Sequence, residues 1–314
     1  MLEVHPPVGL MPDTADLNFY TVDPDLAFLL RQHLSEDEYE RAQPILTSMG
    51  AVASRRMDEL AATADRQVPV LEQFDKRGQR VDEVLYSSAY RELERIAYQD
   101  FAIAACSHRE GVLGWPGRVP QPVKFALGYL GMQAEAGVFC PVSMTDALAR
   151  VLERYGSEPL KQRFLPGLTA LSLEDLQQGA MFLTEKQGGS DVGLTSTIAK
   201  PRADTSSTGE LQPEWELWGD KWFCSNVSAD LILTLARPEG AVAGTRGLGL
   251  FLVPKVLENG QRNTYTINRL KNKLGTRSMA TGEVTLNGAQ AYLVGDIARG
   301  FVQMTEMINL TRMW

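Results

Sequence analysis

Cysteine and histidine are scarce in this sequence of 314 residues, which contains three of each. The cysteines, Cys106, Cys140 and Cys224, lie far apart and form no C-x-x-C pair. This spacing argues against a disulfide framework or a zinc knuckle and is typical of a protein from a reducing compartment. The histidines have no ligand-like spacing, so no metal site is predicted.

The sequence also lacks a long apolar run. No stretch approaches the roughly 20 residues that a membrane-spanning helix needs, and the first residues show neither the basic start nor the apolar core of a secretory signal. The formal net charge of −8 disfavours non-specific binding to phosphate backbones or anionic membranes. We therefore expect a cytoplasmic protein with no membrane partner.

Helical patterns fill the first half of the sequence. Ser35 and Glu38 have the spacing of a capping box, and Pro44 predicts an interruption or restart of the helix that they begin. Further helices are predicted over residues 81–108, 123–139, 142–155 and 159–166. Gly156 stands where a left-handed residue would close the helix before it.

After Gly179 the pattern changes to short apolar or alternating runs separated by turn residues. These runs are residues 180–183, 215–218, 221–225, 231–236, 247–253, 264–267 and 283–286. Their spacing predicts a small antiparallel β-barrel or sandwich. From Gly300 an amphipathic pattern begins, which we expect to be the first turns of a C-terminal helical bundle that this sequence lacks. The predicted fold class is α+β, with an N-terminal helical domain (1–178), a middle β-barrel domain (179–296) and the start of a truncated helical domain (297–314).

The segment with the most specific pattern is residues 181–191, MFLTEKQGGSD. Gly188 and Gly189 permit a tight turn and a close approach of the backbone to a ligand. The hydroxyls of Thr184 and Ser190 can donate to a phosphate or to the polar edge of a ring. On spacing alone, such a turn is more often a surface loop.

This segment resembles the Thr-Glu-x-x-x-Gly-Ser-Asp signature of acyl-CoA dehydrogenases, in the form found in the AidB-like branch. Other segments resemble motifs of the same family and follow its order: residues 154–167 (RYGSE to LPG), 221–226 (KWFCSN) and 271–277 (KNKLGTR). The resemblance implies a helical domain, a β-barrel and a C-terminal four-helix bundle. It also implies FAD as the cofactor and the α,β-dehydrogenation of an acyl-CoA thioester as the reaction.

The resemblance assigns cofactor-binding roles by position. Met181, Phe182, Leu183 and Thr184 would lie against the flavin ring, Gly189 and Ser190 would approach the pyrophosphate, and Phe223, Cys224 and Ser225 would cover the other side. Phe223 stands where many relatives have tryptophan, so it would act by contact alone. For a single aromatic residue on a strand, a place in the barrel core is the more frequent role.

No catalytic base is recognised in the sequence. The family reaction needs a carboxylate that removes the α-proton while hydride passes to the flavin, and most members carry it deep in the C-terminal bundle. An isovaleryl-type subgroup carries it just before an arginine, where this sequence has Thr311 before Arg312, and threonine has no useful basicity. The resemblance also brings Asn309, Thr311 and Arg312 near the substrate, although Arg312 fits a helix-surface charge equally well.

Several functions remain open at this point. The first is an acyl-CoA dehydrogenase that forms a homo-oligomer or receives its C-terminal bundle from a partner chain. The second is an AidB-like alkylation-response flavoprotein that associates with DNA, which the acidic net charge disfavours. The third is a non-catalytic flavin-binding subunit. The basic cluster Arg269, Lys271, Lys273 and Arg277 is more often a solvated strand edge than a nucleotide or nucleic-acid site.

Overall fold

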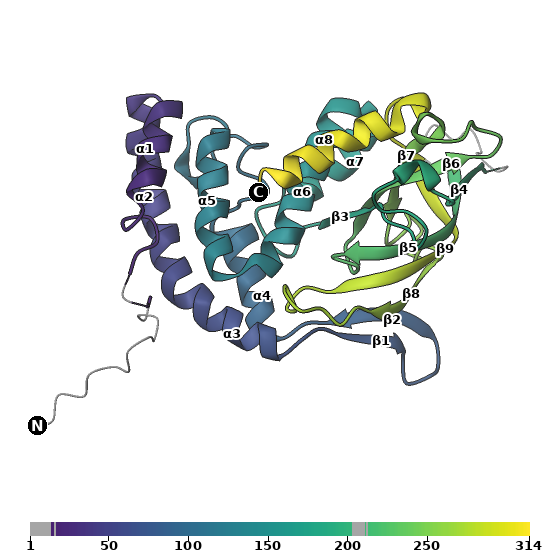
Figure 1. Cartoon of the computed structure of the whole chain (residues 1–314), viewed down its shortest axis with the longest axis horizontal. Coiled ribbons are helices and arrows are strands. Elements are labelled where there is room, and N and C mark those ends of the chain that lie inside the picture. The colour runs from purple at the N-terminus through teal and green to yellow at the C-terminus, as the bar shows by residue number, and fades with distance from the viewer. Residues whose placement is uncertain (1–13, 16, 203–210, 212) are drawn as a thin grey trace, which may run out of the picture.

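A helical half and a β-barrel follow one another along the chain, as the sequence predicts (Figure 1). The computed structural model describes residues 14–15, 17–202, 211 and 213–314. Helices α1 to α5 lie on one side and the barrel on the other, and α8 (yellow) runs from the barrel across α6. Among the described residues, no helix is long and apolar enough to cross a membrane.

The helical half contains α1 (Pro24–His33), α2 (Glu36–Val52), α3 (Asp58–Arg66), α4 (Ser88–Glu94), α5 (Gln121–Ala134), α6 (Ala136–Tyr155) and α7 (Glu158–Leu168). π-Helical turns follow α2 (Ala53–Met57) and α4 (Arg95–Asp100). Short 3₁₀ turns occur at Val112–Gly114, Val192–Leu194, Thr245–Gly247 and Ile297–Arg299. The predicted capping box is confirmed, because Glu38 N donates to Ser35 Oγ at 3.4 Å and Ser35 N donates to Glu38 Oε2 at 2.8 Å.

Some predicted helix boundaries are wrong. Helix α2 continues through Pro44 without a break. Residues 81–108 do not form one helix: Arg80–Leu85 is strand β2, which pairs with β1 (Val70–Phe74), and the helix begins only at Ser88. The strand alternation buries Val84 and leaves Leu85 42% exposed, so the apolar spacing that resembled a helix came from a strand followed by a helix.

Gly156 also differs from its prediction, because its φ of −63° is not left-handed. It is extended, and a Cβ atom there would lie 2.7 Å from the Leu152 carbonyl oxygen. Close packing against the last turn of α6 therefore accounts for this glycine. The predicted helix over 123–139 is divided at Glu135, whose carboxylate caps α6 by accepting from the amides of Gly137 and Val138.

The barrel is built from β3 (Gly179–Phe182), β4 (Ile198–Pro201), β5 (Trp215–Ser225), β6 (Leu231–Pro238), β7 (Gly249–Pro254), β8 (Tyr265–Leu270) and β9 (Thr281–Leu293). Strands β6, β4, β5, β9 and β7 follow one another by hydrogen bonding, and β7 pairs again with β6, which closes the sheet. The predicted barrel is thus confirmed, but the β3–β6 and β4–β6 pairings are parallel. The runs 215–218 and 221–225 form the single strand β5, and β4 was not predicted.

Strand β6 is buried on both faces. Ile232 and Ala236 lie in the barrel interior, whereas Leu231, Leu233 and Leu235 pack against α6, α7 and α8. This explains the continuous apolar run in the sequence. The β1–β2 hairpin lies against the free edge of β8, where Asp82 Oδ2 accepts from Ile267 N at 3.0 Å. Polar side chains thereby satisfy an otherwise unpaired strand edge.

The predicted helix from Gly300 is α8 (Gly300–Arg312). Trp314, just after it, joins a buried polar cluster around Asp146 of α6. The Asp146 carboxylate accepts from Lys124 Nζ at 2.7 Å, His108 Nε2 at 2.9 Å and Trp314 Nε1 at 3.2 Å. Although burial opposes it, the hydrogen bond from His108 and the Lys124 charge hold the pKa of Asp146 below its ordinary value.

We predict that Asp146→Asn lowers the free energy of unfolding by about 3–5 kcal/mol, because Lys124 would remain fully buried without its anion. Urea unfolding at neutral pH measures this change. Glu110→Gln removes an exposed carboxylate nearby and serves as the control. Equal unfolding midpoints for the two variants would contradict the prediction.

Candidate cofactor site

The outer surface where β3 meets β5 brings the two predicted cofactor motifs together. Trp222 N of β5 donates to Thr184 O, just after β3, at 2.9 Å. Along β3 and the residue after it the side chains alternate. Phe182 points into the barrel interior, whereas Met181 and Leu183 pack on the outer side, against the apolar core that β6 and β7 form with α6 and α8. Contact between Phe182 and a ligand on the outer surface would therefore come from its backbone.

A β-bulge in β5 decides which side chains reach this surface. Lys221 pairs with Val284 and Cys224 pairs with Gly282, so Trp222 and Phe223 together oppose a single residue of β9. A bulge of this kind changes the direction in which a side chain points. As a result Phe223 is 55% exposed, while Cys224 is fully buried in the barrel interior, where burial raises the pKa of its thiol.

Ser225, the next residue, is half-buried beside α6. Its partner there is the thiol of Cys140, whose pKa is raised by burial although the hydrogen bond with Ser225 opposes this. The outward residues of the predicted set are therefore Met181, Leu183, Thr184, Phe223 and Ser225. Gly189 and Ser190 are exposed on the adjoining loop.

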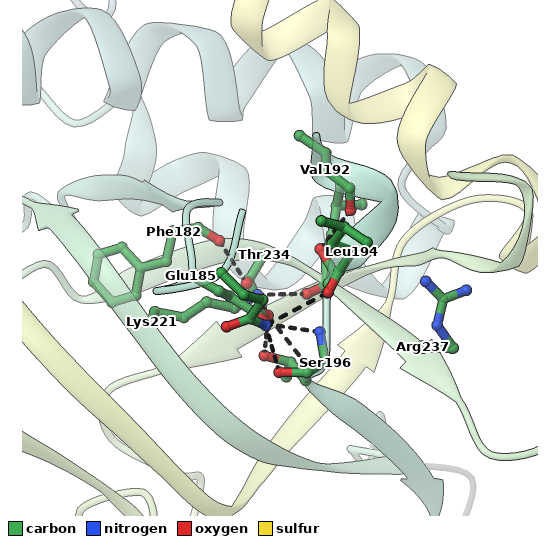
Figure 2. A network of polar contacts seen from close by, with 12 residues as sticks. Phe182, Glu185, Val192, Leu194, Ser196, Lys221, Thr234 and Arg237 are labelled. Atoms are coloured by element: carbon green, nitrogen blue, oxygen red, sulfur yellow. Dashed lines mark hydrogen bonds and ion pairs between the residues drawn. The ribbon is translucent and has the colours of Figure 1, made fainter. Parts of the chain in front are cut away.

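Glu185 organises that loop (Figure 2). Its carboxylate is 3% exposed and accepts from Lys221 Nζ at 2.8 Å and from Thr197 Oγ1 at 2.5 Å. The amide and hydroxyl of Ser196 each donate to it at 2.7 Å, and Gln187 Nε2 donates at 2.6 Å. A single carboxylate thus fixes both ends of the segment 185–197 to the barrel.

Both members of the Glu185–Lys221 pair are buried, with side chains 2% and 0% exposed. Lys221 Nζ also donates to Leu235 O at 2.9 Å, and burial lowers its pKa while Glu185 opposes the shift. Burial by itself would raise the pKa of Glu185, but the Lys221 charge and the hydrogen bonds outweigh it and lower that pKa to about 2. Glu185 is therefore ionised at neutral pH, and its negative charge favours the ammonium form of Lys221.

Close packing favours glycine at both positions of the turn, more strictly at Gly188 than at Gly189. A Cβ atom at Gly188 would lie 2.7 Å from the Asp191 carbonyl oxygen, and one at Gly189 would lie 3.2 Å from Thr184 Cγ2. Arg237 supports the far side of the loop, where its Nη2 donates to Gly193 O at 2.9 Å. These contacts hold the turn at Gly188 and Gly189 against Thr184, with Ser190 exposed beside it.

The predicted substrate residues lie on α8. Asn309 lines a cavity of about 470 Å³ together with His108, Lys124 and Asp146. Thr311 Oγ1 donates to Ile308 O at 3.0 Å within its own helix, and Arg312 is exposed. The lining of this cavity comes from α5, α6, α8 and the turn at Ser107–His108 rather than from β3 or β5.

Sequence reasoning assigned no role to Glu185, Lys221 or the bulge. The available signal was a glutamate directly after one apolar strand and a lysine that begins the aromatic part of another. Of the basic cluster, Arg269 and Lys271 each lie 2.6 Å from Glu283, and Lys273 donates to Met279 O at 2.7 Å. Arg269, Lys271 and Lys273 therefore bond to groups of β9 and of the loop between β8 and β9.

We predict that Glu185→Gln lowers the free energy of unfolding by about 3–5 kcal/mol at neutral pH, because it leaves the Lys221 ammonium buried without an anion. Since the folded pKa of Glu185 lies below its ordinary value of 4.5, its stabilisation is present above pH 4.5 and is lost as pH falls toward about 2. The difference between wild type and variant should therefore shrink over that interval in urea unfolding. A difference independent of pH would contradict this assignment.

Comparison with known proteins places the chain in a family. Residues 10–174, more than half of the chain, match the adaptive response protein AidB N-terminal domain, and residues 180–289 match the acyl-CoA dehydrogenase middle domain. The chain is 33% identical over 303 residues to acyl-CoA dehydrogenase family member 11 of Caenorhabditis elegans. The aligned region covers 94% of this chain and 47% of that protein. It is 33% identical over 268 residues to putative acyl-CoA dehydrogenase AidB of Escherichia coli, with coverage of 81% and 45%.

Solved structures agree with these matches. C. elegans ACDH-11 in complex with C11-CoA superposes with a TM-score of 0.83 at 32% identity, covering 98% of this chain and 52% of that one. Bd2924 in its apo form gives a TM-score of 0.83 at 35% identity, with coverage of 94% and 57%. The chain spans about half the length of the curated relatives it matches. The chain belongs to the acyl-CoA dehydrogenase family, in the branch that carries the AidB N-terminal domain.

Proposed function

We propose that this chain forms the flavin-binding part of an FAD-dependent oxidoreductase that acts on acyl-CoA thioesters. The observation that carries the proposal is one surface, on which the bulge exposes Phe223 next to Trp222, Trp222 N bonds to Thr184 O, and Gly189 approaches the Thr184 side chain. The family motifs meet there although they are far apart in the sequence.

The chemistry of this surface fits FAD. An isoalloxazine ring has apolar faces and a polar pyrimidine edge, and Phe223, Met181 and Leu183 offer apolar contact while Thr184 and Ser225 offer hydroxyls. The glycine turn leaves backbone amides and Ser190 open to a pyrophosphate. When bound, FAD would supply the hydride-accepting chemistry, and these residues would hold and orient it.

The substrate proposal rests on α8 and on a relative. The ACDH-11 structure contains C11-CoA, and Asn309, Thr311 and Arg312 lie on the helix at the positions that the resemblance assigns to substrate contact. Because the Thr311 hydroxyl is bonded within its own helix and is not basic, we propose that the carboxylate that removes the α-proton comes from outside these 314 residues.

The same observation on Thr311 favours a second candidate, a flavin-binding subunit without catalysis of its own. The two candidates differ in one respect: the first becomes active when the missing carboxylate is supplied by further chain or by a partner. The test uses a form of the chain extended by residues that correspond to the C-terminal half of a relative. When a saturated medium-chain acyl-CoA is added under anaerobic conditions, the flavin band of the first candidate bleaches and that of the second does not.

Other features of the proposal concern the whole protein. We propose a cytoplasmic location, supported by free and widely separated thiols, and, from the family resemblance alone, a homo-oligomer or partner chain. We propose the domain division 1–178, 179–296 and 297–314, supported by the gap between the end of α7 at Leu168 and the start of β3 at Gly179.

We predict that the purified chain binds added FAD and that Phe223→Ala weakens the affinity on the order of tenfold, because an aromatic contact with the ring is lost. Titration of the visible flavin band measures the affinity. Phe74→Ala is a matched control, since Phe74 on β1 is 56% exposed and Phe223 is 55% exposed. Absence of binding at saturating FAD, or equal affinity of both variants, would contradict the proposal.

We also predict that acyl-CoA leaves the flavin band of this FAD-loaded chain unbleached, because Thr311, which stands at the position of a catalytic base, cannot accept the α-proton. Anaerobic spectra before and after acyl-CoA addition check this. Bleaching by the 314-residue chain alone would mean that a base exists within it, and the roles given to α8 would have to be revised.

A further inference from the structure

Glu283 of β9 stands opposite irregularities in both neighbouring strands. On the β5 side, Trp222 and Phe223 bulge out between the pairs that flank Glu283. On the β8 side, the register shifts between Ile267 and Arg269, and Arg269 pairs with Glu283. Between these two irregularities, the Glu283 carboxylate accepts from Arg269 Nε and Lys271 Nζ, each at 2.6 Å.

Lys271 connects this carboxylate to the exposed aromatic residues. Its Nζ lies 2.6 Å from Glu283 Oε1, 3.5 Å from the centroid of the Trp222 ring and 4.7 Å from that of Phe223. The Lys271 side chain is only 13% exposed, although it lies on the barrel surface. The Trp222 and Phe223 rings meet edge to face, with centroids 6.4 Å apart and an interplanar angle of 78°.

An ammonium that touches two rings restricts both of them. A cation is attracted to the negative face of an aromatic ring, and here the cation is itself fixed by a carboxylate. Lys186 and Arg269 also approach the Trp222 ring, at 4.7 Å and 5.8 Å, but Lys271 contacts both rings. Without it, the half-exposed Phe223 on a bulge would be free to change rotamer.

We infer that Lys271, anchored by Glu283, is a positioning residue that holds Trp222 and Phe223 so that Phe223 presents its ring to the flavin. This inference rests on the proposed function, because Phe223 is the side chain that the proposal sets against the cofactor. It adds that the approach of the flavin depends on a charged residue about 50 positions further along the chain, outside both cofactor motifs of β3 and β5.

The test compares Lys271→Met with Lys271→Arg, and Lys76→Met on the β1–β2 turn removes a distant exposed charge as a control. Near-ultraviolet circular dichroism of the protein without FAD reports the packing of the aromatic rings, and titration with FAD gives the affinity. Far-ultraviolet dichroism and the thermal midpoint verify folding. We expect Lys271→Met to change the aromatic signal and to weaken FAD binding roughly tenfold, Lys271→Arg to retain most of both, and Lys76→Met to resemble wild type.

The outcomes are distinguishable. If wild type and Lys271→Met bind FAD equally, the inference is overturned while the proposed function stands. If wild type itself does not bind FAD, the proposed function fails and the inference fails with it. If FAD binding weakens while the aromatic signal of the free protein is unchanged, Lys271 does not act by positioning the rings, and the inference is again overturned.

Discussion

Lys221 occupies the interior of the barrel, and a fully buried ammonium costs several kcal/mol unless an anion accompanies it. The anion is Glu185, 36 residues earlier in the chain, which lies at the beginning of the loop after β3. Because the same carboxylate also accepts from Ser196 and Thr197, the loop must return to the barrel wall. Together with the bond from Trp222 N to Thr184 O, this pair fixes the start of the loop that carries Gly189 and Ser190 beside β5.

Strand β5 links the buried Glu185–Lys221 pair to the outer surface of the barrel. Lys221 points inward, the bulge sends Trp222 and Phe223 outward, and Cys224 returns to the interior. Thus Lys221 of the interior ion pair and Trp222 of the outer surface are consecutive residues. On the outer face Lys271 contacts both rings and is paired with Glu283, so charged side chains pack against β5 on both of its faces.

Local signals made much of the fold predictable. The capping box at Ser35, the helix begun near Pro159 and the continuous apolar run of β6 depend on neighbours in sequence, and the structure confirms them. The β1–β2 hairpin was missed because Leu85 and the residues of α4 together imitate helical spacing. Neither the parallel pairings of β3 and β4 with β6 nor the Glu185–Lys221 pair could be predicted, since each depends on partners brought together only by the folded chain. For the site, the motifs indicated the surface, but burial of Phe182 depends on which face of β3 turns toward the barrel interior, and burial of Cys224 depends on the bulge in β5.

We propose that FAD binds where the loop of Glu185 meets the bulge of β5. Hydrogen–deuterium exchange of the whole chain, with and without FAD, tests it most directly, because ligand contact slows exchange of the amides it covers. We expect protection to appear in peptides that cover residues 181–190 and 222–225, with α1 and α2 unchanged. Protection confined to other segments, under conditions in which FAD is bound, would contradict the claim.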